Sequence, residues 1–268
     1  MSQNVFKDAD GNQVCRRITQ AEITTTVPWL EQITGLDFTE EKDTKGVPTK
    51  WLGTTGRKTD SGDLDLSVDD KAITKETLAG VLERWCQRAG IPTDQIYNTK
   101  TNRNRWIAMS GDSVHFKTPI NGDVKNGFAQ TDFMFGDPKW QQFAMQGGRE
   151  GSPYKGMSRH IILNSILSAI NPQYSWSYKN GIIDKVDPKN PTTIPDGKNP
   201  QTLSKLTGIP VAKLNTADDI VDAISKRPDY NQLVAKARET LAHDNISLPE
   251  GNPTPGTAAW FRKMGHVV

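Results

Sequence analysis

The feature that most constrains this chain is a short stretch in which acidic or polar residues alternate with apolar ones. Residues 63–68 read Asp-Leu-Asp-Leu-Ser-Val. Successive side chains of a β-strand point to opposite faces of its sheet. The alternation therefore predicts a strand with Asp63 and Asp65 on one face and Leu64 and Leu66 on the other. The leucines would anchor the strand in a core, and the Cα atoms of the two exposed acids would lie roughly 6.6 Å apart at ~3.3 Å per residue.

A third acid lies on a later predicted strand. Asp132 belongs to the run Gln-Thr-Asp-Phe-Met-Phe at 130–135, in which Phe133 and Phe135 face one side and the acid faces the other. The chain between Asp65 and Asp132 has room for a helix and another strand, so the two acid-bearing strands could lie side by side. Carboxylates at this spacing can hold a pair of Mg²⁺ ions ~3.5–4 Å apart for in-line phosphoryl transfer. The alternative is a solvated strand face that holds no metal.

A glycine-rich segment precedes the first two acids. It reads Gly53-Thr54-Thr55-Gly56-Arg57-Lys58. Glycines allow backbone N–H groups to approach phosphate oxygens closely, and threonine hydroxyls add donors. Arg57 and Lys58 supply positive charge for the same oxygens. The spacing excludes a Walker A loop, because Gly53 and Gly56 are only three residues apart and an arginine follows the second glycine.

Two further basic residues lie near the start of a helix predicted over 156–170. Lys155 and Arg159 are four residues apart and would share one helix face. On that face they could reach a triphosphate or an acceptor phosphate. The alternative is an ordinary basic start of a helix, and the sequence leaves both interpretations open.

Composition limits the possible partners and compartments. The chain has 33 basic and 31 acidic residues and a formal net charge of +2, which argues mildly against a long nucleic acid as partner. Its two cysteines are too few for a disulfide framework, and its four histidines show no metal-ligand spacing. No apolar run approaches the ~20 residues that span a bilayer, and the N-terminus lacks a signal-peptide pattern. We therefore predict a cytoplasmic protein with no membrane partner.

Periodicity and turn signals predict a series of helices and strands. We expect helices over 19–34, 75–88 and 156–170, strands over 63–68, 113–120 and 129–135, a hairpin over 173–185, and helices over about 201–207, 217–226 and 229–243. The predicted domains are one folded domain over 1–186, a linker rich in Pro, Asn and Lys over 187–200, a helical region over 201–245 and an extended C-terminal arm over 246–268.

Taken together, these motifs resemble the DNA polymerase β-type nucleotidyltransferase superfamily. Its signature is an apolar residue, Gly and Gly or Ser, a spacer, and then Asp-x-Asp between apolar residues. Here Gly53-Thr54 is followed by the acids at 63 and 65 and by the later strand acid at 132. Thr54 stands where Ser is usual, and the spacer over 55–62 is slightly short. The resemblance covers residues 20–185 and is closest to nucleotidyltransferase-like proteins carried by phages.

The resemblance implies an α+β fold, a small mixed β-sheet flanked by helices; the C-terminal helical region that we expect after it comes from the helical patterns over 201–243 and not from the resemblance. It also implies two Mg²⁺ ions and a nucleoside triphosphate such as ATP as donor. Asp63 and Asp65 would ligate metal, and Asp132 would ligate metal and act as base toward an acceptor hydroxyl. The nucleotide-binding residues would then be Gly53, Thr54, Thr55, Arg57, Lys58, Lys155 and Arg159.

The acceptor of the transferred nucleotide stays open at this point. An RNA 3′ end, a protein side chain and a small molecule are all compatible with the sequence. The alternative function is that of a non-catalytic structural or binding protein on the same fold, such as a phage particle component, because function need not follow fold. In that case the C-terminal arm would mediate self-assembly or bind a protein partner. A phage origin would place the protein in the host cytoplasm or in the virion.

Overall fold

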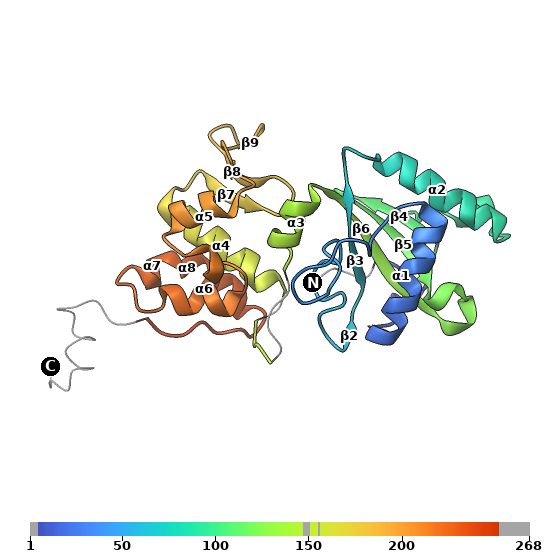
Figure 1. The fold of residues 1–268 in the computed structure, drawn as a ribbon, viewed down its shortest axis with the longest axis horizontal. Coiled ribbons are helices and arrows are strands. Elements are labelled where there is room, and N and C mark those ends of the chain that lie inside the picture. Colours follow the sequence, from blue (N-terminus) through green and yellow to red (C-terminus); the bar gives the residue numbers. More distant parts are fainter. Residues whose placement is uncertain (1–4, 147–150, 155, 252–268) are drawn as a thin grey trace. The chain divides into compact units, whose positions relative to one another are not determined.

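The computed structural model of the chain describes residues 5–146, 151–154 and 156–251. The chain forms two compact units, residues 1–147 and 148–268 (Figure 1). The predicted domain boundary at 186 is therefore wrong. The long helix α4 (Gly156–Ile170) belongs to the second unit because it packs against the C-terminal helices and against a small sheet that follows it.

The first unit is built on a mixed four-stranded sheet. Its strands are β3 (Leu64–Asp69), β6 (Phe128–Gly136), β5 (Ser113–Pro119) and β4 (Ile107–Ser110), in that order across the sheet. β3 runs parallel to β6, and the other neighbours are antiparallel. The predicted α+β class and three of these strands are confirmed, whereas the edge strand β4 was not predicted.

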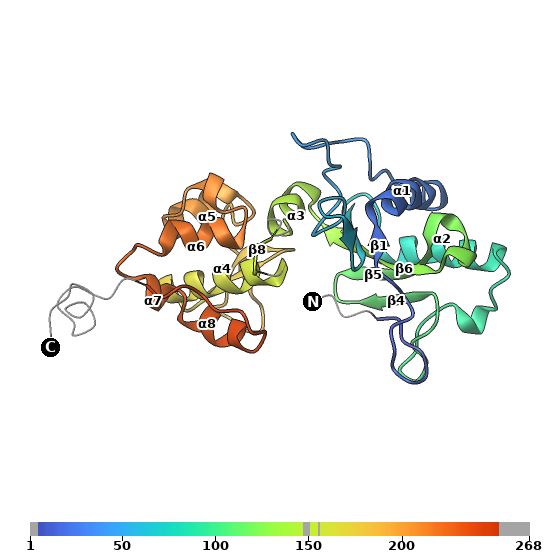
Figure 2. The ribbon, with the colours of Figure 1, turned by 90° about the horizontal axis from the view of Figure 1, so that it is seen from below.

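Two helices cover one face of this sheet (Figure 2). In α1 (Gln20–Thr34), Thr19 accepts from the N–H of Glu22 and Glu22 accepts from the N–H of Thr19, a capping box that fixes the helix start. In α2 (Lys75–Arg88), Thr74 caps the first turn. Both helices bury their apolar stripes against the apolar face of the sheet, which includes the fully buried Leu64, Leu66, Val114, Phe116 and Phe133.

Short elements complete the first unit. β1 (Ile18–Thr19) pairs antiparallel with β2 (Asp60–Ser61), which holds the segment before the first acids against the start of α1. The 3₁₀ helices η1 (Thr93–Gln95), η2 (Ile120–Gly122) and η3 (Val124–Asn126) lie in the connections. Asp137 caps α3 (Pro138–Ala144), and Pro138 at its first position is compatible with a helix start.

The second unit surrounds α4. A sheet of β7 (Tyr174–Ser177), β8 (Gly181–Asp184) and β9 (Thr192–Thr193) confirms the predicted hairpin and adds a third strand. The remaining elements are α5 (Pro200–Thr207), η4 (Val211–Lys213), α6 (Ala217–Ile224), α7 (Tyr230–Leu233) and α8 (Ala235–Ala242). None of the helices within the described ranges is both long enough and apolar enough to cross a bilayer.

The segment predicted as a linker, 187–200, is instead part of the second unit. It contains β9, and the N–H of Ile182 donates to the carbonyl of Gly197 at 2.9 Å. A Cβ at Gly197 would come within 2.7 Å of the Ile182 carbonyl oxygen, so only glycine permits this close backbone packing.

The start of the predicted arm also packs on the second unit. Leu248 is buried, and the Tyr230 hydroxyl donates to the carbonyl of Pro249 at 3.0 Å. Residues 252–268, the rest of the arm, lie outside the described part of the chain.

Candidate metal centre

Three carboxylates converge on the face of the first unit's sheet that α1 and α2 leave uncovered. Asp65 on β3 and Asp132 on β6 are direct neighbours across the parallel pair. Asp63 precedes Asp65 by two residues, so its side chain leaves the same face. Each acid offers one oxygen, and these three oxygens all lie within 4.8 Å of one another, as required for a shared cation. The predicted grouping of Asp63, Asp65 and Asp132 is therefore confirmed as geometry.

Hydrogen bonds from two neighbouring residues orient Asp132. The Gln130 amide donates to Asp132 Oδ1 at 2.8 Å, and His115 Nδ1 lies 2.7 Å from the same oxygen. His115 is on β5, directly opposite Asp132 in the antiparallel ladder. A carboxylate can only accept, so Nδ1 donates to Asp132, and the other ring nitrogen, Nε2, is hydrogen-bonded to the Ser110 hydroxyl at 2.7 Å. Both described donors use Oδ1, which leaves Oδ2 for a cation.

The three carboxylates are partly or fully buried and lie close together, so their negative charges repel one another. Burial, together with the negative charge of Asp132, raises the pKa of Asp63 from 3.8 to about 7. Burial and the charges of Asp63 and Asp132 also raise the pKa of Asp65 well above its ordinary value. Without a counter-ion, the cluster therefore retains protons near neutral pH. A divalent cation would remove this penalty, and carboxylate oxygens are the ligands that Mg²⁺ prefers, so the donor set fits the ion.

The glycine-rich loop lies directly against the cluster. The N–H of Leu52 donates to the carbonyl of Asp65 at 2.9 Å, which joins the loop to the outer edge of β3. Gly53 has a φ of +58°, and a Cβ there would come within 2.6 Å of Asp65 Oδ2. Any other residue would therefore be strained and would push into the carboxylate. The structure therefore gives Gly53 a steric reason, close packing against Asp65, that differs from the phosphate contact predicted from the sequence.

Most of the loop's hydrogen-bonding groups are already engaged. The N–H groups of Gly53, Thr55 and Arg57 donate to carbonyls of the protein. Thr55 is fully buried, and its hydroxyl accepts from the N–H of Asp65 at 3.0 Å. The predicted donation of Gly53 and Thr55 N–H groups and of the Thr55 hydroxyl to a phosphate is therefore wrong. Both residues shape the loop instead.

The remaining polar groups of the loop differ in whether they are available to contact a phosphate. The Thr54 hydroxyl is paired with Ser61 at 2.6 Å, and Arg57 forms an ion pair with Asp43 at 3.1 Å. Within the described ranges, the N–H groups of Thr54 and Gly56 donate to no other residue. Lys58 is half-buried and forms no ion pair with a described residue. Thr54 and Lys58 thus remain candidates for phosphate contact, and Arg57 would first have to leave Asp43.

Arg159, one of the two basic residues predicted to contact a phosphate, is not an exposed cation. Arg159 is buried in the second unit, and its Nε donates to the carbonyl of Leu214 at 2.8 Å. Burial lowers the pKa of this guanidinium to about 9. The predicted phosphate contact of Arg159 is replaced by a structural role within its own unit. Lys155 lies outside the described residues.

Sequence reasoning missed His115, Gln130 and Ser110 as parts of the site. Gln130 could have been found, since it lies two residues before Asp132 on the same strand and so on the same face. His115 could not, because its place opposite Asp132 depends on the register of β5 and β6. Its lack of spacing to other histidines and cysteines had suggested no role in a metal site.

Comparisons with protein-family models, with curated proteins and with solved structures found no match to this chain. The functional interpretation therefore depends on the site's own geometry and on the sequence motifs. The arrangement can bind a divalent cation through three carboxylates and can present that cation to a ligand near the glycine-rich loop.

Proposed function

We propose that the first unit is a metal-dependent nucleotidyltransferase: an acceptor hydroxyl attacks the α-phosphate of an NTP, the nucleoside monophosphate is transferred to that hydroxyl, and pyrophosphate leaves. The observation on which the proposal depends is the convergence of Asp63, Asp65 and Asp132 within 4.8 Å on one face of a mixed sheet. A fold does not require three carboxylates at one place, because they repel one another there unless a cation binds.

In this proposal the acids hold Mg²⁺, and other residues of the chain hold the acids. Bound Mg²⁺ would supply positive charge for the phosphate oxygens of the donor and for the oxygens that attack and leave. His115 and Gln130 fix the rotamer of Asp132 through Oδ1, and Thr55 fixes the backbone of Asp65. Residues that orient metal ligands in this way maintain both the affinity of the site for its metal and the coordination geometry.

The donor triphosphate would lie along the loop that begins at Gly53. The absence of a side chain at Gly53 lets the loop backbone pack closely on the Asp65 carboxylate. The N–H groups of Thr54 and Gly56, which donate to no described residue, and the ammonium group of Lys58 match the negative charge of phosphate oxygens. Asp132 would hold the cation with one lone pair of Oδ2, and the other lone pair of that oxygen would accept the proton of the acceptor hydroxyl.

The acceptor is not defined by this site. The net charge of +2 gives no strong general attraction to a polyanion. Incubating the protein separately with RNA, with protein and with small alcohols in the presence of labelled NTP distinguishes the three classes of acceptor.

The test of the proposed function is the transfer of label from an NTP labelled at its α-phosphate. The double variant Asp63→Ala, Asp65→Ala should abolish transfer, as should removal of divalent cations by EDTA. Asp70→Ala is the matched control, because Asp70 is an exposed acid just after β3 and should leave transfer unchanged. Transfer that persists in the double variant would refute the proposed role of these acids.

A thermal-shift measurement provides a readout that needs no acceptor. Mg²⁺ and NTP together should stabilise the wild-type protein more than either alone, because ligands that bind the native state raise its stability by mass action. A non-catalytic scaffold that binds neither would show no shift in any combination.

A further inference from the structure

Three residues on β4, β5 and β6 form a chain of hydrogen bonds that ends at the surface of the first unit. The Ser110 hydroxyl, at the end of β4, lies 2.7 Å from His115 Nε2 on β5. His115 Nδ1 lies 2.7 Å from Asp132 Oδ1 on β6. The order hydroxyl, imidazole, carboxylate is that of a nucleophilic serine, its general base and the acid that orients the base. Such a set is recognised by its geometry and not by its order along the chain.

The direction of each hydrogen bond in this chain suits activation of the serine. Because a carboxylate only accepts, His115 Nδ1 donates to Asp132. In the neutral imidazole, the lone pair of Nε2 then accepts from the Ser110 hydroxyl. Gln130 donates to the same oxygen of Asp132 at 2.8 Å and so limits rotation of the carboxylate. The imidazole is therefore held with its basic nitrogen directed at the serine.

Exposure to solvent differs along the chain as a nucleophile and its base require. The side chains of His115 and Asp132 are only 9% and 5% exposed, so water competes little for the hydrogen bond between them. Ser110 is exposed, so a substrate can reach its hydroxyl. A Cβ built on the next residue, Gly111, would meet no atom within 4 Å, which shows that the space beside the serine is open. The nucleophile is accessible, whereas the groups that activate it are protected.

The antiparallel register of the sheet holds the three residues in place. His115 pairs with Asp132 across β5 and β6, and Ser110 pairs with Ser113 at the turn that joins β4 to β5. Groups that are carried by strands are positioned more precisely than groups on loops. The N–H of Gly111, the residue after the serine, donates to no described residue. A backbone N–H at this place is a suitable donor to an oxyanion that forms on the substrate.

We propose that Ser110 is the nucleophile of a second catalytic site, which hydrolyses carboxylic esters with a short acyl chain. Ser110 Oγ attacks the carbonyl carbon of the ester and gives its proton to His115 Nε2. The bond from that carbon to the alcohol oxygen breaks, and the alcohol leaves with the proton from Nε2. Water then attacks the acyl-serine, and His115 takes a proton from the water and returns it to Ser110 Oγ as the carboxylic acid leaves. Because Ser110 lies exposed at a turn, a long acyl chain would stay in water, so a short one is expected.

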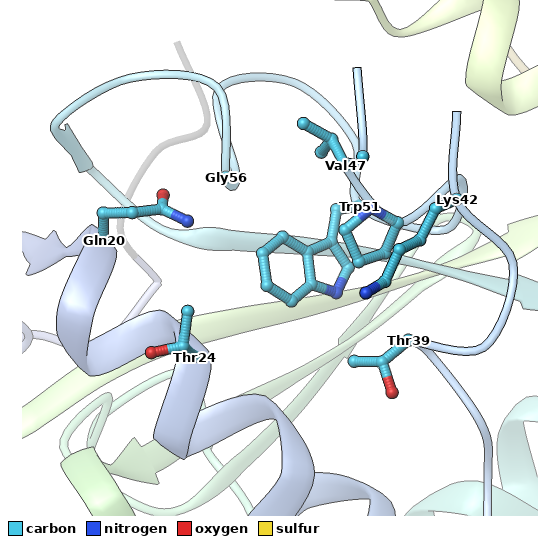
Figure 3. Close-up of a pocket in the computed structure, with 9 residues that line it drawn as sticks. Gln20, Thr24, Thr39, Lys42, Val47, Trp51 and Gly56 are labelled. Carbon is cyan, nitrogen blue, oxygen red and sulfur yellow. The ribbon is translucent and has the colours of Figure 1, made fainter. Parts of the chain in front are cut away.

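The second site shares Asp132 with the candidate metal centre but uses a different oxygen of that residue. His115 and Gln130 are bonded to Oδ1, and the cation would bind Oδ2. Ester hydrolysis by this route uses neither a cation nor a nucleotide, so the inference does not depend on the nucleotidyltransferase proposal. The pocket beside Trp51 (Figure 3) is lined by none of the three residues of the chain and takes no part in the proposed hydrolysis.

A fluorophosphonate probe, added to the full chain in EDTA and without NTP, tests the nucleophile directly. An activated serine attacks the phosphorus of the probe, fluoride leaves, and the hydroxyl proton passes to the base. We expect intact-mass spectrometry to show one adduct and tandem mass spectrometry to place it on Ser110. Ser110→Ala should abolish the adduct, and the fold should tolerate this change because the residue is exposed. Ser247→Ala removes another exposed serine and should leave the labelling unchanged.

Hydrolysis of p-nitrophenyl acetate measures turnover and the contribution of the base. Ser110→Ala and His115→Ala should each lower the rate by ~100-fold or more, because general-base catalysis contributes ~10²–10⁴-fold. Circular dichroism shows whether His115→Ala, a change at a buried position, is folded. If it is not, the wild type and Ser110→Ala decide, since the exposed serine can be replaced without loss of core packing.

Three results would overturn the proposal. The first is a folded wild-type protein that forms no adduct on Ser110. The second is equal labelling of Ser110 in the folded protein and in urea, which means that the fold does not activate the hydroxyl. The third is a folded His115→Ala variant with unchanged labelling and hydrolysis, which makes Ser110 an ordinary exposed serine. Label transfer from an NTP needs Mg²⁺ and is measured separately, so failure of either proposal is distinguishable from failure of the other.

Discussion

Replacing Asp63 with asparagine should stabilise the metal-free protein above neutral pH. The folded pKa of about 7 lies above the ordinary value of 3.8, so the native state binds this proton more tightly than the unfolded state does. The resulting stability is complete below pH 4 and is lost as the pH rises to 7. At ~1.4 kcal/mol per pH unit the full loss is about 4 kcal/mol. Because Asp63 keeps part of its surface in water, we expect about 2 kcal/mol.

Thermal unfolding in EDTA at pH 4.5 and pH 8 measures this effect. Asp63→Asn should gain about 4–8 °C relative to wild type on going from pH 4.5 to pH 8, at ~2–4 °C per kcal/mol. Adding Mg²⁺ at pH 8 should then stabilise the wild type and leave the variant nearly unchanged. Asp70→Asn, at an exposed position, should behave as wild type throughout. A variant that follows the wild-type pH profile, or that is less stable at pH 8 in EDTA, would refute the reasoning.

Three further predictions concern the site and its support. Gly53→Ala and Gly11→Ala both place a side chain at positive φ, and Gly11→Ala should cost about 1 kcal/mol in urea unfolding. Gly53→Ala should cost more and should also reduce Mg²⁺-dependent stabilisation, because its Cβ would push into the Asp65 carboxylate, whereas a Cβ at Gly11 meets open space. His115→Ala should weaken Mg²⁺ binding, measured by calorimetry, by ~10–100-fold, because Asp132 loses one of its two orienting partners. Phe133→Ala should lower the free energy of unfolding by about 3–5 kcal/mol, because the ring is fully buried.

The candidate site was predictable because its signals are local and periodic. Strict alternation over 63–68 fixes which side chains share a face, and the same logic applies to Asp132 and Phe133 on β6. The predicted limits of α2 and α4, 75–88 and 156–170, coincide with the observed ones. Each has an apolar stripe, and a Gly or Pro follows soon after its end. Strand faces and helix limits, which a short stretch of sequence determines, were therefore predicted correctly.

The errors have a common physical cause, which is long-range packing. A segment rich in Pro and Asn resembles a linker, yet residues 187–200 gain order through β9 and through the close approach of Gly197 to β8. An arginine near the start of a helix is suited to contact a phosphate, but the packing of α4 within the second unit buries Arg159. The edge strand β4 gave no clear alternation and depends on β5 for its hydrogen bonds.

Several features that lower the stability of the fold occur together at the candidate metal centre of the first unit. Acids with raised pKa values lie next to a loop whose glycine adopts a positive φ directly against one of them. Removing the acids would relieve the repulsion, and a polar sheet face does not need carboxylates to remain hydrated. Such local penalties persist when a ligand compensates for them, and they are concentrated at functional sites. A cation that binds three carboxylates neutralises the repulsion and makes use of the open Oδ2 of Asp132. The hydrogen bonds from His115 and Gln130 then have a purpose that folding alone does not give them, because they hold one oxygen so that the other is presented.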